Sequence, residues 1–454
     1  MTELENIQIE INELSLDQVF SLLEQQDVDQ LQLILSSALP GQIADILEAM
    51  PPNERKQLWA LIPESLGSET LTFLHDEVRN ALIIEMPAEE LVAAAERMEV
   101  NDLADMIEEL PEPVRQTIED SLSAEILEHL ETSLSFDDGT AGRLMSPDVI
   151  TVRSDVTLAT VLRYLHIHED LPDYTDGLMV IDREGIYQGK LLLNKVLTHN
   201  EDTLVQELMS IQHQAIPSGT SEHDIALFFE QSNFVSAAVV DDNNHLLGRI
   251  TMDDVIHILR SEADHALMSS AGLDEEADLF APVIKSAKQR TIWLFFNLIT
   301  AFLAAWVIGM YAETVEKIVA LAVLMPVVAS MGGIAGSQTL TLTIRGLALN
   351  QISNGNMRWL ARKEVLIGMI NGLIWSAVVA GIAWLWFQDV GISLVIAAAI
   401  VINLIAAAAA GIAIPLTLHR LGIDPALSGA VVLTTVTDVV GFMSFLGLAT
   451  HYLL

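Results

Sequence analysis

An acidic residue lies near the middle of the last long apolar stretch of this chain. Asp438 ends the run Thr434–Asp438, in which three of the five residues are threonine, and this run lies inside Ala426–Leu453. An ionised carboxylate is costly within a bilayer, so such a residue usually faces a water-filled cavity on an ion or proton path. The threonine hydroxyls add oxygen ligands, which suit a hard cation better than an organic solute. The structural alternative is a protonated aspartate hydrogen-bonded to a neighbouring helix.

Five apolar stretches make up the C-terminal part, and each is long enough to span a bilayer, which takes about 20 residues as a helix. They are Ile292–Tyr311, Ile318–Leu349, Val365–Phe387, Ile392–Leu418 and Ala426–Leu453. Basic residues gather before the first stretch, between the second and third, and between the fourth and fifth. Since positively charged loops usually stay inside, we expect the N-terminal part in the cytoplasm and the C-terminus outside.

The net negative charge of the chain comes entirely from its N-terminal part. Of the formal net charge of −40, none comes from the residues after 290, which include six acidic and six basic side chains. A strongly acidic surface repels nucleic acid and attracts cations, although many such charges simply confer solubility. The absence of cysteine excludes disulfides, thiolate metal sites and thiol nucleophiles. The first residues lack the basic and apolar regions of a secretory signal, as expected for a cytoplasmic N-terminus.

The middle of the chain contains an internal repeat. Val180–Asp182 followed by Gly189 returns as Val239–Asp241 followed by Gly248, an offset of 59 residues. Each copy has an apolar β-run, a turn with aspartate, a glycine, a second β-run and a helix-like segment. This pattern resembles a tandem pair of CBS domains, and the second copy, with Gly248–Val255, matches more clearly than the first.

The first part of the chain is predicted to form short amphipathic helices separated by prolines. Ala44–Pro51 returns as Ala104–Pro111, an offset of 60 residues. Helical pairs that repeat in this way stack into a superhelix or solenoid.

This order of parts resembles the MgtE family of magnesium channels and transporters over essentially the whole chain. The most specific matching stretches are Leu324–Ala348 and Pro415–Gly441. The resemblance implies a multidomain membrane protein with an α-helical N-terminal superhelical domain, α/β tandem CBS domains and an all-α five-helix transmembrane domain. The expected boundaries are 1–136 for the helical domain, 137–265 for the CBS pair (143–205 and 206–265), 266–290 for a connecting helix and 291–454 for the transmembrane domain.

The resemblance also implies a function. Family members are homodimers in a bacterial inner membrane, with the pore between the subunits and Mg²⁺ held at the position of Asp438. The carbonyl of Thr434 would add to this site, and a lower-affinity site would lie near Asp424 at the cytoplasmic side. A pore or packing motif would comprise Gly332, Gly333, Gly336, Gln338 and Pro415. From residue type alone, the glycines suit either close helix packing or a broken helix. Ile334 replaces the asparagine that usually follows the two glycines.

Gating in the family works by feedback from cytoplasmic Mg²⁺, and this sequence retains only part of the pattern. The positions that match sensor ligands are Glu69, Asp105, Gly142 (through its carbonyl), Asp254 and Glu262. Other residues stand where carboxylates are expected, namely Asn101, Ser221, His223, Asn233, His257, His265 and Ala266. Neighbouring acids such as Asp102 can compensate by a shift of one residue. We therefore expect weaker Mg²⁺ feedback with an added pH response, from His257 and His265. ATP binding by the CBS pair is implied but not assigned to residues.

Two other classes of function have features in common with this sequence. An ion-pumping ATPase or another enzyme would need a phosphate-binding glycine-rich loop or a nucleophile constellation, and the sequence has neither in recognisable form. A proton-coupled secondary transporter would also use a membrane aspartate, and transport of Co²⁺, Mn²⁺ or Ni²⁺ is the other alternative, since oxygen-rich sites select weakly among such ions.

Overall fold

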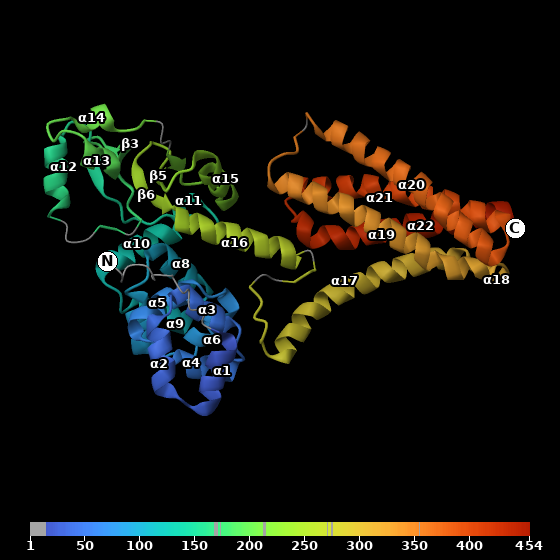
Figure 1. Ribbon diagram of the computed structural model, residues 1–454, viewed down its shortest axis with the longest axis horizontal. Helices are drawn as coiled ribbons and strands as arrows, with labels where there is room; N and C mark the ends of the chain where they lie inside the picture. The colour runs from blue at the N-terminus through green and yellow to red at the C-terminus, as the bar shows by residue number, and fades with distance from the viewer. Residues whose placement is uncertain are drawn as a thin grey trace, which may run out of the picture. The chain divides into compact units, whose positions relative to one another are not determined.

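The computed structural model describes residues 15–167, 171–172, 174–211, 215–269, 271–273, 276–353 and 355–454. The first residues, from which the absence of a secretory signal was predicted, lie outside these ranges. The chain forms two compact units, one with residues 1–263 and 276–281 and the other with 264–275 and 282–454. Figure 1 shows both units, and each is described by itself below.

In the described part of the first unit, ten short helices precede the α/β region and confirm the predicted helical domain (Figure 1). These are α1 (Leu16–Gln25), α2 (Val28–Ser37), α3 (Pro40–Glu48), α4 (Pro52–Trp59), α5 (Glu64–Thr72), α6 (Asp76–Ile83), α7 (Ala88–Ala95), α8 (Val100–Glu109), α9 (Glu112–Glu119) and α10 (Ala124–Leu134). The pair α3 and α4 recurs as α8 and α9 at the offset of 60 residues found in the sequence. Prolines stand at the helix starts, where their missing N–H costs nothing: Pro40, Pro51 and Pro111 are examples. The apolar faces meet in one continuous core.

Two copies of an α/β unit follow. The first comprises α11 (Ala141–Leu144), β1 (Thr151–Arg153), α12 (Leu158–Leu165), β2 (Gly177–Ile181), β3 (Tyr187–Leu192) and α13 (Leu193–Thr198). The second comprises α14 (Val205–Leu208), β4 (Ile216–Pro217), α15 (Glu222–Ser232), β5 (Ser236–Val240), β6 (Leu246–Thr251) and α16 (Met252–Ser269).

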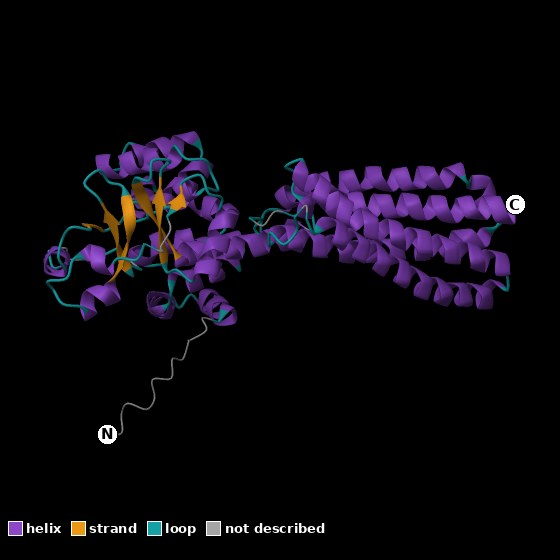
Figure 2. Cartoon of the chain, turned by 90° about the horizontal axis from the view of Figure 1, so that it is seen from above, coloured by secondary structure: helices purple, strands orange, loops and turns teal. Residues whose placement is uncertain are grey.

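The two sheets of these copies, orange in Figure 2, have the same topology. In each, the first strand pairs parallel with the second, which pairs antiparallel with the third. The antiparallel register shifts at Val180/Ile181 in one copy and at Val239/Val240 in the other, again 59 residues apart. The repeat therefore includes its irregularity, and the predicted tandem CBS architecture is confirmed.

The expected connecting helix over 266–290 is interrupted, which corrects that prediction. Helix α16 ends at Ser269, and α17 begins only at Val283. Between them, Gly272 has a φ of +70°, which L side chains rarely adopt, and Pro282 directly precedes α17. Proline restrains the residue before it from helical conformation, so the helix restarts after this point.

The second unit consists of long helices. These are α17 (Val283–Met310), the short α18 (Ala312–Lys317), α19 (Val319–Ala348), α20 (Met357–Phe387), α21 (Val390–Arg420) and α22 (Pro425–Leu453). Five helices in the described part, all but α18, are long and apolar enough to cross a membrane, as predicted. Helix α21 is the most buried of them and packs against α19, α20 and α22. Pro326 and Pro415 lie inside continuous helices, so the second span is not broken.

Candidate functional site

The carboxylate of Asp438 lies half-buried on α22. Within the described part of the chain, it has no hydrogen-bond or ion-pair partner. A protonated aspartate bonded to a neighbouring helix is thus not what the described residues form. A membrane carboxylate without a protein partner leaves its oxygens available to an ion or to water.

The threonines around Asp438 direct their hydroxyl protons to the backbone of their own helix. Thr434 Oγ1 donates to the carbonyls of Ala430 and Val431 at 3.1 Å each, and Thr437 Oγ1 donates to the Thr434 carbonyl at 3.0 Å. Each hydroxyl oxygen keeps lone pairs after donating its proton. The oxygens of this turn therefore remain possible ligands, but the protons are already committed.

Two glycines of α19 pack closely against α21 and α22. A Cβ atom added to Gly336 would lie 2.9 Å from Leu433, and one added to Gly332 would lie 2.3 Å from the Nδ2 atom of Asn403. Asn403 is fully buried and donates from Nδ2 to the Val328 carbonyl at 2.9 Å. Two of the predicted motif glycines thus serve close helix approach.

The other members of the predicted motif do not join this contact. Gly333 has nothing within 4 Å of an added Cβ, and Ile334 is 63 % exposed in the isolated chain. Pro415 is buried in α21, whereas Gln338 borders a separate cavity. On α19, Gly332 and Gly336 therefore pack against other helices, whereas Gly333 and Ile334 do not.

Asp424 caps the N-terminus of α22. Its two oxygens accept from the backbone N–H groups of Ala426 at 2.8 Å and Leu427 at 3.2 Å. His265 Nε2 lies 3.1 Å from the same carboxylate. Asp424 therefore has a structural role at the helix start, and a cation there would share the carboxylate with His265.

The retained sensor acids lie apart from one another. Asp105 accepts from Arg143 Nε at 2.9 Å, and Glu262 lies 2.7 Å from His223 Nδ1. Asp254 accepts from the Thr251 N–H at 2.7 Å, which closes the start of α16, and Glu69 is exposed on α5. The described residues contain no group of three or more His, Cys, Asp or Glu side chains arranged to hold a metal.

Gly142 is buried at the start of the CBS pair. An added Cβ there would lie 2.4 Å from the Phe136 ring, and its N–H donates to the Ser218 carbonyl at 2.8 Å. Only glycine fits so close to an aromatic ring. This close packing explains why glycine is needed at position 142, whether or not its carbonyl also binds an ion.

Burial and repulsion act on a set of carboxylates shared by α8 and α16. Burial, with the charges of Glu99, Asp254 and Asp105, raises the pKa of Asp102 to about 7. Burial also raises the pKa of Asp254 to about 7, against the lowering effect of its hydrogen bond from Thr251. These acids therefore carry excess negative charge above neutral pH, which a bound cation would relieve.

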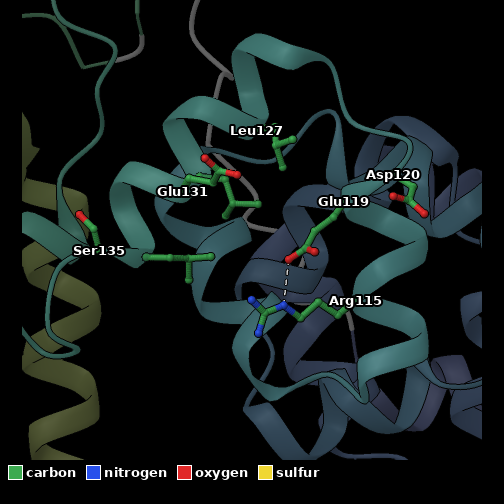
Figure 3. Close-up of a pocket in the computed structure, with 8 residues that line it drawn as sticks. Arg115, Glu119, Asp120, Leu127, Glu131 and Ser135 are labelled. Atoms are coloured by element: carbon green, nitrogen blue, oxygen red, sulfur yellow. Dashed lines mark hydrogen bonds and ion pairs between the residues drawn. The ribbon is translucent and has the colours of Figure 1, made fainter.

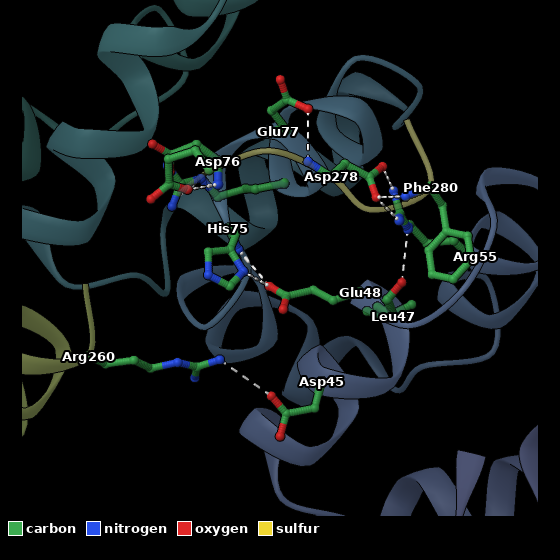
Figure 4. A network of polar contacts seen from close by, with 12 residues as sticks. Asp45, Leu47, Glu48, Arg55, His75, Asp76, Glu77, Arg260, Asp278 and Phe280 are labelled. Atoms are coloured by element: carbon green, nitrogen blue, oxygen red, sulfur yellow. Dashed lines mark hydrogen bonds and ion pairs between the residues drawn. The ribbon is translucent and has the colours of Figure 1, made fainter. Parts of the chain in front are cut away.

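Residues 276–281, just before α17, are held by ion pairs and hydrogen bonds to the helical domain (Figure 4). Arg55 Nη1 and Nη2 donate to the two oxygens of Asp278 at 2.8 and 2.9 Å. The two side chains are only 2 % and 6 % exposed. The Asp278 N–H donates to Glu77 at 2.9 Å, and the Asp76 N–H donates to Glu276 at 2.6 Å.

Of the two histidines predicted to respond to pH, His265 lies 3.1 Å from Asp424 and His257 is exposed beside an aromatic ring. Partial desolvation lowers the pKa of His257, whose ring lies 5.2 Å from that of Phe73. His75, by contrast, lies 2.6 Å from Glu48, and this contact raises its pKa (Figure 4). No sequence pattern marked His75, since its partner lies on another helix.

A cavity of about 480 Å³ lies between α9 and α10. It is lined by Arg115, Glu119, Asp120, Leu127, Leu130, Glu131, Leu134 and Ser135, and Arg115 Nε donates to Glu119 at 2.8 Å (Figure 3). None of the predicted ligand residues borders it.

Sequence reasoning missed Glu364, which is only 4 % exposed although it lies in the membrane helix α20. Thr339 and Lys363 are its neighbours, at 3.3 and 3.6 Å. Its position after Arg362 and Lys363 resembled an ordinary charged helix end, and the apolar run that follows was the only signal.

Comparison with known proteins supports the same assignment for each part. The MgtE divalent cation transporter model matches residues 325–448, the MgtE intracellular N domain model 38–139 and the CBS domain model 205–261. The magnesium transporter MgtE of Bacillus subtilis is 23 % identical over 435 residues, covering 96 % of each chain. That of Thermus thermophilus is 26 % identical over 437 residues, covering 94 % of this chain and 96 % of the relative.

Among solved structures, the cytosolic domain of the Mg²⁺ channel MgtE in complex with ATP resembles the first unit in fold. It has a TM-score of 0.50 and 24 % identity, and covers 54 % of this chain and 100 % of that structure. The three family models match successive parts of this chain, and the two relatives align with it over nearly their whole length. The chain belongs to the MgtE family.

Proposed function

We propose that this protein carries Mg²⁺ across a membrane, with the ion held at Asp438. The observation that carries the proposal is a carboxylate in the membrane helix α22 with no partner in the described part of the chain. Full-length relatives are named magnesium transporters, which supports Mg²⁺ as the cargo.

The chemistry of Mg²⁺ fits one carboxylate from each of two subunits. Mg²⁺ prefers an octahedral oxygen shell, loses water reluctantly and is usually held by one or two carboxylates. In a homodimer with its pore between the subunits, two Asp438 side chains and the Thr434 carbonyls would surround a hydrated ion. The threonine hydroxyls, which donate to the backbone, keep oxygen lone pairs for its water shell.

The remaining membrane assignments follow the distribution of charge. We place the N-terminal domains in the cytoplasm and the C-terminus outside, in a bacterial inner membrane, because the basic connectors lie on one side. Asp424, at the cytoplasmic start of α22, would form a second, weaker site in addition to capping the helix.

Regulation by cytoplasmic Mg²⁺ would act on the soluble unit and be weaker than the family pattern implies. Asp102 and Asp254 have the excess charge that a cation would neutralise. Asp105 and Glu262, however, already have cationic or hydrogen-bonding partners in Arg143 and His223. Glu69 and the Gly142 carbonyl would contribute only after rearrangement. Nucleotide binding by the CBS pair remains a proposal without assigned residues.

Growth rescue tests this function. A bacterial strain that lacks its own Mg²⁺ uptake systems should grow at low external Mg²⁺ when it expresses this chain. The Asp438→Asn variant should fail to rescue, whereas Glu313→Gln should rescue normally, since Glu313 is an exposed acid paired only with Lys317. Equal rescue by all three proteins, at equal membrane abundance, would contradict the proposal.

The alternative is a proton-coupled transporter, or one for Co²⁺, Mn²⁺ or Ni²⁺. The buried carboxylate of Glu364 is the observation that keeps proton coupling open. Mg²⁺ uptake that stops when the pH gradient is abolished, or uptake of another metal in preference to Mg²⁺, would favour this alternative.

A further inference from the structure

A second polar cavity lies in the membrane unit, between α19, α20 and α21. Its volume is about 170 Å³. Five polar side chains border it, namely Gln338, Thr339, Lys363, Glu364 and Asn371. Helix α22, which carries Asp438, contributes no residue to this lining. The cavity is therefore distinct from the site proposed above.

The protein atoms around Glu364 compensate its charge only weakly. Charge-assisted hydrogen bonds to a carboxylate are usually about 2.7–2.9 Å long. Thr339 Oγ1 donates to Glu364 at 3.3 Å, and Lys363 Nζ lies 3.6 Å away. The Lys363 side chain is 47 % exposed, whereas that of Glu364 is 6 % exposed. The ammonium therefore lies at the surface of the chain and beyond hydrogen-bond distance, so the buried carboxylate has room for a further partner.

The size and lining of the cavity indicate what that partner is. A water molecule takes about 30 Å³ in the liquid, so this space holds about five waters. The amide oxygens of Gln338 and Asn371, with the Thr339 hydroxyl, can accept hydrogen bonds from such waters. A divalent cation that keeps most of its hydration shell needs one carboxylate and several neutral acceptors, and Mg²⁺ has this preference.

We propose that this cavity is a cation site separate from those at Asp438 and Asp424, in which Glu364 binds a hydrated divalent cation through water. The cation replaces the Lys363 ammonium as the main partner of the carboxylate. The choice of a divalent ion rests on the proposed function, but the site is independent of Asp438. The ion is held from α19 and α20 together, two helices with few other contacts between them.

Electron paramagnetic resonance with Mn²⁺ as the probe tests the site directly. The natural chain has no cysteine, so Leu366→Cys, at a residue 52 % exposed on α20, gives a single attachment point for a nitroxide. The full-length protein is placed in lipid nanodiscs and carries Asp438→Asn and Asp424→Asn, which remove the carboxylates of the two ion sites proposed on α22. We expect Mn²⁺ to enhance relaxation of the nitroxide at saturable concentrations, and excess Mg²⁺ to reverse the effect.

Three variants decide the outcome. Glu364→Gln should weaken the Mn²⁺ effect at least tenfold, and Asn371→Leu should weaken it several-fold while leaving the carboxylate in place. Lys363→Met, which removes the competing ammonium, should strengthen it several-fold. The proposal is overturned if Glu364→Gln leaves the Mn²⁺ titration unchanged, or if Lys363→Met weakens it, because Lys363 would then be the natural partner.

The same set separates this site from the proposed function. A Glu364-dependent Mn²⁺ titration, together with normal Mg²⁺ transport by the Asp438→Asn protein, would support the cavity site and defeat the role of Asp438. Loss of transport in Asp438→Asn without any Mn²⁺ effect at the label would do the reverse. A pH-dependent transport change in Glu364→Gln without Mn²⁺ binding would identify a proton site and overturn the proposal.

Discussion

The buried ion pair between Arg55 and Asp278 leads to a quantitative prediction for the soluble unit. Asp278→Asn keeps the shape of the side chain and one acceptor oxygen but removes its charge, and Arg55 keeps its bonds to the backbone carbonyls of Leu47 and Met50. Breaking a buried pair by removing one partner costs about 3–5 kcal/mol. Because Arg55 retains those two bonds, we expect the lower end, about 3 kcal/mol, for release of residues 276–281.

Hydrogen exchange in the full-length protein measures this release. The N–H groups of Asp278 and Phe280 donate to carboxylates at 2.9 Å, so their exchange reports opening of the segment. Since each 1.4 kcal/mol is a factor of ten, exchange in Asp278→Asn should be about 100-fold faster. Arg55→Met should have a similar effect, and the double variant should add little to either single change.

Lys56→Met is the matched control. Lys56 and Glu85 also form an ion pair, at 2.9 Å, but their side chains are 65 % and 56 % exposed. Such a surface pair contributes less than about 1 kcal/mol, so exchange at Asp278 should not change. Equal exchange in the Arg55 and Lys56 variants would refute the reasoning, as would release of the wild-type segment by Mg²⁺ chelation alone.

Three further predictions concern packing, pH and capping. Gly332→Ala should lower the thermal stability of the purified protein, because its Cβ would meet Asn403 at 2.3 Å, whereas Gly333→Ala, with open space, should not. Without divalent cations, protease protection of the soluble unit should be greater at pH 6 than at pH 8. The pKa values of Asp102 and Asp254 are raised to about 7 from an ordinary 3.8, so ionising these two carboxylates destabilises the folded soluble unit as the pH rises. Added Mg²⁺ should reduce the difference in protection between the two pH values. Identical protection at both pH values without divalent cations would contradict this. Asp424→Asn should lower the melting temperature only slightly, since asparagine also caps helices. A clear change in Mg²⁺ inhibition or conductance at nearly unchanged melting temperature would indicate ion binding. A lower melting temperature with normal flux would favour the capping role alone.

Much of the fold could be predicted because it repeats or follows simple periodicity. The offset of 59 residues anticipated two sheets of equal topology, and the apolar stretches anticipated the membrane helices within a few residues. The first and third spans are the exceptions, because α17 begins at Val283, before the expected Ile292, and α20 begins at Met357, before the expected Val365. Charged residues there continue each helix beyond its apolar run. The break before Pro282 was not predicted, because the sequence alone does not show that Gly272 adopts a positive φ.

The candidate site was less predictable, since partners came from distant parts of the chain. Asp438 was marked by its position in an apolar run, which needs no tertiary contact to recognise. The pairing of Asp105 with Arg143, across 38 positions, has no local sequence signal. Glu364 could not be singled out from the sequence, because its burial comes from neighbouring helices in the fold. Local pattern identifies an unusual residue, but only the fold supplies its neighbours.

The central claim, that Asp438 holds the transported ion, is tested most directly by Mg²⁺ flux into liposomes that contain the purified protein. The initial rate is measured with a trapped Mg²⁺-sensitive dye for wild type, Asp438→Ala and the control Glu313→Gln, at equal amounts of folded protein. Flux in Asp438→Ala should fall at least tenfold. The variant removes a membrane carboxylate on α22 that has no protein partner within the described part of the chain. Glu313→Gln should match wild type. Unchanged flux in Asp438→Ala would contradict the account.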